Sequence, residues 1–101
     1  MSARVIRVRG VVQGVGFRPF VYRLAHAHGL RGWVLNGESG VAIHAEGGEA
    51  ALEAFIRSLV DDCPPAAEIE SVEIRESEPE GFPEFSIRES ERSGPPTVRI
   101  S

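Results

Sequence analysis

The sequence predicts an α+β sandwich in which two helices cover one face of a single antiparallel sheet. Three observations carry this prediction. Apolar residues alternate in some segments and recur at helical spacing in others, these segments follow the order strand, helix, strand, strand, helix, strand, and glycine- or proline-rich turns separate them. A chain of 101 residues has room for one hydrophobic core and therefore for one domain.

The first strand and the first helix lie on either side of a glycine-rich turn. Arg4 to Val12 alternates apolar residues with arginines, as a strand with one buried face does. After the turn, Pro19 stands where a helix begins, because its missing N–H costs nothing in the first helical turn. Apolar residues then recur at helical spacing as far as Gly29, which is a natural stop. We expect a helix from about Arg18 to His28.

A β-hairpin is expected next. Its first strand is Gly32 to Leu35, and its second strand is Val41 to Glu46, in which apolar residues alternate. The connection, Asn36 to Gly40, consists of residues that favour turns.

The second half of the chain repeats the pattern of helix and strand. Glu49 to Val60 carries an apolar stripe, and the acidic residues Glu49 and Glu53 stand near its start, as the helix dipole favours. Two prolines follow Cys63 and end this helix. Glu68 to Glu76 is expected to form a fourth strand, and Phe85 with Ile87 marks a short fifth one.

This order of elements is that of the ferredoxin-like βαββαβ sandwich, which is built from two split βαβ units. Right-handed crossovers place both helices on the same face of the sheet. The first and third strands are then central, so the end of the second strand approaches the turn that follows the first. The core is expected to bring Ile6, Val8 and Val12 of the first strand against Val21, Leu24, Leu52, Phe55, Ile56 and Leu59 of the helices.

Charge is distributed unevenly along the chain. Residues 1–37 hold six arginines and no acid, whereas the remaining 64 residues hold 15 acids and five arginines, giving +6 and −10. A cationic segment on an acidic protein favours a local anion site over a nucleic-acid surface. Compositional bias explains the overall charge asymmetry equally well, so only individual arginines indicate an anion site.

Several function classes are disfavoured by composition. Cys63 is the only cysteine, which excludes an internal disulfide and a cysteine-based metal cage, and the three histidines do not stand at ligand spacing, so no metal or cofactor is expected. No apolar run approaches the roughly 20 residues of a membrane span. The first residues alternate arginine with apolar side chains and do not resemble a signal peptide. A cytoplasmic protein without a membrane partner is expected.

The turn between the first strand and the first helix is a candidate phosphate site. Its glycines allow backbone N–H groups to turn inward, the helix adds the positive end of its dipole, and an arginine supplies a fork of donors. The candidate residues are Gln13, Gly14, Val15, Gly16, Phe17 and Arg18. The Gly-Lys-Ser/Thr ending of an ATP-binding loop is absent, so ATP is not implied. A plain tight turn followed by a surface arginine is the alternative.

Asn36 is the second candidate, because it ends a strand that approaches this turn. A neutral amide holds a water molecule by hydrogen bonds without repelling an incoming anion. The alternative is that Asn36 only favours the hairpin turn.

Two segments carry a resemblance to a known family. Gly10 to Arg18 resembles the first acylphosphatase signature, and Gly32 to Asn36, with the later Gly40 and Gly47, is similar to the second. The resemblance runs from about Arg4 to Arg88. Further segments, Gly16–Ala25 and Cys63–Glu73, resemble the N-terminal acylphosphatase-like domains of the carbamoyltransferases that mature [NiFe]-hydrogenases.

The resemblance implies a role for each candidate residue. Arg18 and the loop amides would hold the phosphate of carbamoyl phosphate or another acyl phosphate, and Asn36 would orient the attacking water. The products would be phosphate and carbamate, and downstream domains of the same polypeptide would use the carbamate, with ATP, to make the cyanide-ligand precursor. Leu35 departs from the pattern, because free acylphosphatases commonly have a basic residue there, and this puts efficient turnover of the domain alone in doubt.

The resemblance also implies the domain boundaries: an acylphosphatase-like domain at residues 1–90 and a linker at residues 91–101 toward a following module. The alternatives are a free-standing acylphosphatase, which would end near Ile87, and a non-catalytic module that binds an anion for regulation. An RNA-binding module is disfavoured because Ile6–Val12 and Val41–Ala45 offer no exposed aromatic residue, so no nucleic-acid partner is expected.

Overall fold

The computed structural model describes residues 1–37 and 40–88 of the chain. Its elements, in chain order, are β1 (Ser2–Val11), α1 (Phe17–Ala27), β2 (Arg31–Asn36), β3 (Gly40–Gly47), α2 (Glu49–Asp61), β4 (Glu68–Ser77) and β5 (Phe85–Ile87). This confirms the predicted order of strands and helices. The predicted linker at residues 91–101 lies outside the described residues, as does the end of the predicted domain at residue 90.

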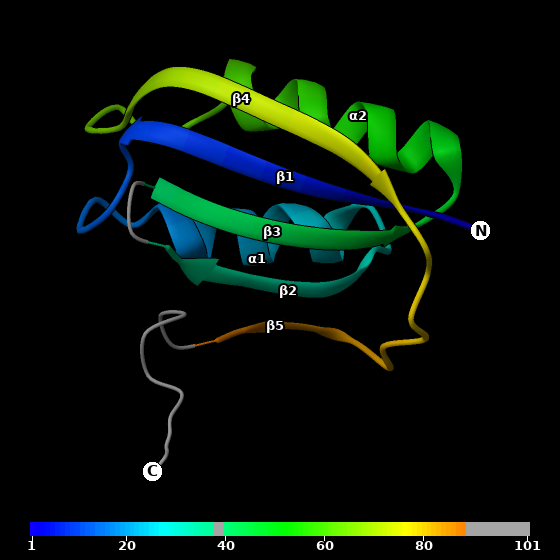
Figure 1. Ribbon diagram of the computed structural model, residues 1–101. Coiled ribbons are helices and arrows are strands. Elements are labelled where there is room, and N and C mark those ends of the chain that lie inside the picture. The colour runs from blue at the N-terminus through cyan, green and yellow to red at the C-terminus, as the bar shows by residue number, and fades with distance from the viewer. Residues whose placement is uncertain (38–39, 89–101) are drawn as a thin grey trace, which may run out of the picture.

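The five strands form one sheet in the order β4-β1-β3-β2-β5, and Figure 1 shows α1 and α2 together on one face of it. As predicted, β1 and β3 are central, and β1 to β4 pair only in antiparallel fashion. The short β5 differs, because it runs parallel to β2 and makes the sheet mixed. It occupies the outer edge of β2, where Gly32 N–H donates to the carbonyl of Glu84 (3.1 Å) and Arg88 N–H to that of Val34 (2.8 Å).

The predicted core lies between the helices and the sheet. Every strand residue predicted to face the helices is buried, and so are the main apolar residues of the helices, whereas Leu24 and Ile56 are partly buried at its margin. The core residues are Ile6, Val8, Val12, Phe17, Val21, Ala25, Leu30, Val34, Val41, Ile43, Ala45, Leu52, Phe55, Leu59 and Phe85. This cluster fixes β1 against α1, and thereby fixes both ends of the loop between them.

The opposite face of the sheet is partly covered as well. The alternation in β3 predicts His44 on the polar side of its strand, and the structure does place it away from the helices, yet His44 is only 1% exposed. The reason is that the connection between β4 and β5 folds over it: Phe82 meets His44 edge-on, and the Trp33 ring stacks beside it at 5.9 Å. The burial of His44 on this face of β3 therefore comes from the loop that covers it.

Glu46 is the anchor of this covering loop. Its carboxylate is fully buried and accepts hydrogen bonds from the backbone N–H groups of Glu80, Gly81 (3.1 Å) and Phe82 (3.3 Å), and it lies 2.8 Å from Nε2 of His44. Burial alone would raise the pKa of Glu46, but the N–H of Glu80, the His44 ring and the other two N–H groups together hold that pKa below its ordinary value.

Gly32 is required by the close approach of β2 and β3. Its φ is +133°, and a Cβ atom there would lie 1.8 Å from the carbonyl oxygen of His44. We expect Gly32→Ala to lower the free energy of unfolding by about 3 kcal/mol, at the upper end for a strained backbone position. Gly29→Ala is the control, because φ is +68° but nothing lies within 4 Å, and it should cost only about 1 kcal/mol. Urea unfolding of both variants measures this, and equal losses would contradict the steric argument.

Candidate functional site

The loop between β1 and α1 is shaped by two glycines in the left-handed region. Gly14 has φ +75°, and Gly16, directly before the first residue of α1, has φ +79°. A Cβ atom at either position would meet nothing within 4 Å, so backbone conformation, not crowding, favours glycine there. In the described part of the chain, no backbone carbonyl accepts a hydrogen bond from the N–H groups of residues 14–18. Free donors at the start of a helix are suited to an anion.

The other side chains of this loop are used elsewhere. Phe17 is 1% exposed in the core, and Val15 packs against the core from the loop. Of the residues predicted to hold phosphate, these two and the glycines therefore offer backbone N–H groups only. Arg18 is the one charged side chain of the set.

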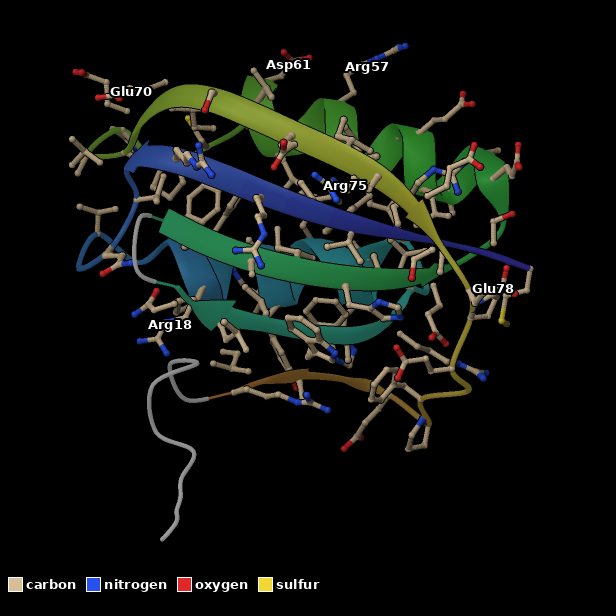
Figure 2. All side chains as sticks on the ribbon, in the orientation of Figure 1. Arg18, Arg57, Asp61, Glu70, Arg75 and Glu78 are labelled. Carbon is tan, nitrogen blue, oxygen red and sulfur yellow. The ribbon has the colours of Figure 1, made fainter. Side chains whose placement is uncertain are left out.

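Arg18 is the second residue of α1 and is half-buried. Figure 2 shows it at the end of the sheet where β2 ends. Its Nη1 atom donates to the carbonyl oxygen of Arg88, just after β5, over 3.4 Å. A hydrogen bond of this length is weak. The guanidinium of Arg18 therefore lies beside the loop, and it can give up the carbonyl of Arg88 for a better acceptor.

Both the backbone and the side chain of Arg88 make contacts that hold the residue in place. Its N–H donates to Val34 of β2, and its guanidinium lies over the rings of Trp33 (5.2 Å) and Phe82 (5.4 Å). Arg88 was not among the residues predicted for the site. The position of Arg88 beside Arg18 could not be predicted from the sequence, because it depends on the parallel pairing of β5 with β2.

Asn36 is the last residue of β2 and pairs with Val41 of β3. Its Oδ1 atom is buried and, among the described residues, finds no hydrogen-bond donor. Buried side-chain oxygens nearly always have a partner, either in the protein or in an ordered water molecule. A donor that enters from outside the protein, such as a water molecule, would satisfy this oxygen.

Gln13 joins the loop to the hairpin. Its Nε2 atom donates to the carbonyl oxygens of Gly37 and Gly40, both at 2.8 Å. The side chain of Gln13 is therefore directed at the residues that follow Asn36 and not into the loop, which sequence analysis did not predict. Through this contact the structure brings the loop and the Asn36 hairpin together.

Two hollows on the described surface lie away from the loop and from Asn36. One, of about 520 Å³, is lined by Ile56, Val60 and Ile74 among others, between α2 and β4, and the other, of about 330 Å³, is lined by residues that include Val5 and Arg75. Neither is lined by a residue of the loop or by Asn36. A small tetrahedral anion needs several convergent donors more than it needs a deep pocket.

Two further findings concern residues 1–37 and 40–88 as a whole. In this part of the chain, no group of three or more His, Cys, Asp or Glu residues is placed to hold a metal ion. Neither of its helices has the length and apolar character needed to cross a membrane.

Comparison with known proteins places this chain in a family. The acylphosphatase family profile matches residues 4–87. An acylphosphatase of Thermotoga petrophila is 47% identical over 89 residues, which cover 87% of this chain and 98% of that protein. Carbamoyltransferase HypF2 of Cupriavidus necator is 53% identical over 89 residues, which cover 87% of this chain and 11% of that protein. The crystal structure of full-length HypF in its phosphate- and nucleotide-bound form superposes with a TM-score of 0.86 and 40% identity, over 89% of this chain and 12% of that one. The chain belongs to the acylphosphatase family and is a hydrolase of the acylphosphatase type.

Proposed function

We propose that this domain hydrolyses carbamoyl phosphate to phosphate and carbamate, as the N-terminal module of a carbamoyltransferase that matures [NiFe]-hydrogenases. The observation that carries the proposal is the similarity to both kinds of relative: 87% of the chain aligns with nearly all of an acylphosphatase, and 87% of it aligns with 11% of a carbamoyltransferase. Downstream domains of the same polypeptide would consume the carbamate, residues 91–101 would link to them, and the whole would work in the cytoplasm.

The phosphoryl group would be bound by the loop. The N–H groups of residues 14–18, which have no backbone acceptor in the described chain, and the Arg18 guanidinium donate to the phosphoryl oxygens. Water attacks phosphorus, the bond from phosphorus to the carbamoyl oxygen breaks, and carbamate leaves with the electron pair of that bond. The protons of the water stay on the phosphate product or pass to solvent. Charge on the phosphoryl oxygens is stabilised by the same donors throughout the transfer.

The attacking water would be oriented by Asn36. Its buried Oδ1 atom, which lacks a donor within the described residues, accepts a hydrogen bond from the water. Because carbamate is a good leaving group, the reaction needs no covalent nucleophile, and catalysis consists of positioning and charge stabilisation.

Asn36→Ala tests this role. We expect kcat for carbamoyl phosphate to fall by about 30-fold, within the range for a misplaced reacting group, while phosphate affinity changes little. The reason is that the water matters in the transition state, whereas the anion is held by the loop and Arg18. Phosphate release gives kcat, and titration of phosphate against backbone amide NMR shifts gives the affinity and should place the largest shifts at residues 13–18.

Controls separate chemistry from folding in the Asn36 variants. Asn36→Asp keeps the side-chain shape but adds a negative charge near the anion, so it should weaken phosphate binding as well. If Asn36 only shapes the turn, Asn36→Ala will lower the melting temperature and leave the turnover of each folded molecule unchanged. That result would remove Asn36 from the mechanism.

A free-standing acylphosphatase of broad substrate range is the second candidate, because the chain aligns with 98% of the Thermotoga petrophila enzyme. Leu35, which is half-buried beside Asn36, favours a domain that works within a larger enzyme, because free acylphosphatases commonly have a basic residue at this position. Rates with carbamoyl phosphate and with acetyl phosphate distinguish the candidates. Comparable rates would favour the free enzyme, and phosphate binding without any phosphate release would favour an anion-binding regulatory module.

A further inference from the structure

We infer that Gln13 is a positioning residue, whose side-chain amide fixes the Asn36 hairpin relative to the phosphate loop during hydrolysis. The inference rests on the proposed role of Asn36. It assigns Gln13 a task different from that of its loop neighbours, whose backbone N–H groups bind the anion.

The contact uses the full donor capacity of the side chain. A primary amide has two N–H bonds, and those of Gln13 are matched by two carbonyl oxygens, of Gly37 and of Gly40, each 2.8 Å from Nε2. The carbonyl of Gly40 also accepts the N–H of Gly37 at 2.7 Å, so Gln13, Gly37 and Gly40 form one hydrogen-bonded unit where the turn joins β2 to β3.

The regular pairing of the sheet does not extend this far. The β1–β3 ladder ends at the pair Arg9 and Gly40, and the β2–β3 ladder ends at Asn36 and Val41. Beyond these pairs, in the described residues, no backbone hydrogen bond joins residues 12–18 to the hairpin. The Gln13 amide is the direct polar link between the two halves of the site in this part of the chain.

One of the two acceptors is a fixed point. A Cβ atom at Gly40 would lie 2.0 Å from the carbonyl oxygen of Val8, so β1 and β3 are in very close contact there and Gly40 cannot shift toward β1. The other acceptor, Gly37, follows Asn36 directly. The amide of Gln13 therefore holds the peptide after Asn36 at a set distance from a rigid part of the sheet.

Asn36 depends on this support because its own Oδ1 atom has no partner among the described residues. The position of the Asn36 amide then depends on the backbone before and after this residue. Gln13 holds the backbone after it, at Gly37. Without Gln13 the phosphate loop would keep its glycines, its helix end and Arg18, while the water-orienting amide would lose its fixed position.

A double-mutant cycle tests the inference. We expect Gln13→Ala to lower kcat for carbamoyl phosphate by about tenfold, as a small misplacement of a reacting group does, and to leave phosphate affinity within about twofold. Made in the Asn36→Ala background, the same change should lower kcat by less than about twofold, because residues that act through one another are not additive. Additive losses, or an unchanged kcat in Gln13→Ala, would overturn the inference.

Two variants separate positioning from general destabilisation. Gln13→Glu keeps the length of the side chain but has no N–H donors, so it should reduce kcat at least as much as Gln13→Ala. Gly29→Ala destabilises the fold at a site remote from the loop and should leave kcat unchanged at a temperature where it is folded. If Asn36→Ala itself leaves kcat unchanged, the proposed water role fails first. If Asn36→Ala does lower kcat but the effects of Gln13→Ala and Asn36→Ala are additive, the role of Gln13 is rejected and the water role of Asn36 is kept.

Discussion

Arg18→Ala is expected to lower kcat/KM for carbamoyl phosphate by at least about 100-fold, which corresponds to about 3 kcal/mol of lost transition-state stabilisation. The change removes the one charged side chain of the loop, and the phosphoryl oxygens then keep only backbone donors. The fold should survive, because Arg18 is half-buried in the first turn of α1 and gives up only a 3.4 Å hydrogen bond to the Arg88 carbonyl.

Two further arginine variants are the controls for Arg18→Ala. Arg18→Lys should fail as well, because a point charge does not replace a planar fork of donors. Arg23→Ala, on the exposed side of the same helix, should keep the parental rate and show that loss of positive charge alone is harmless. Phosphate release measures all three, with circular dichroism melts to confirm folding. Hydrolysis at the parental rate by Arg18→Ala would reject the proposed mechanism.

The parts of the fold that the sequence predicted are those fixed by local periodicity. Leu52, Phe55 and Leu59 recur at helical spacing, and the same residues form the buried face of α2. The candidate loop was predictable for a similar reason, since its glycines and Arg18 are neighbours in the chain. Local conformational preference and one buried face were enough to define each element and its order.

What the sequence did not predict depends on contacts between distant segments. Gln13 meets Gly37 and Gly40, 24 and 27 residues away, and an exposed glutamine in a turn carries no sign of such partners. The three-residue β5 is too short for its periodicity to specify a parallel pairing. Glu46 is buried because the backbone of Glu80, Gly81 and Phe82 folds over the sheet, and these residues lie 34, 35 and 36 positions after Glu46 in the chain.

Glu46→Ala is expected to lower the free energy of unfolding by about 4 kcal/mol, as when one partner of a buried, hydrogen-bonded charge is removed. The variant leaves three backbone N–H groups and the buried His44 ring without their acceptor. Glu53→Ala, an exposed change on α2, should stay within about 0.5 kcal/mol. Urea unfolding at pH 7 compares the two, and a loss below about 1 kcal/mol in Glu46→Ala would show that the carboxylate does not anchor the loop.

The same carboxylate predicts how stability depends on pH. Burial raises the pKa of Glu46, but hydrogen bonds from Glu80, His44, Gly81 and Phe82 outweigh it and lower the pKa below the ordinary 4.5. The unfolded chain therefore binds a proton at Glu46 before the folded chain does, so this group stabilises the fold fully above its ordinary value and progressively less as pH falls through the folded value. Glu46→Gln removes that titration and leaves the other acids in place. Across urea unfolding series from about pH 7 to pH 3, the stability advantage of the parent over Glu46→Gln should stay constant at first and then shrink below about pH 4.5. A constant advantage down to pH 3 would mean that the folded and unfolded chains protonate Glu46 alike, and would contradict the hydrogen-bonded carboxylate as the anchor of the loop between β4 and β5.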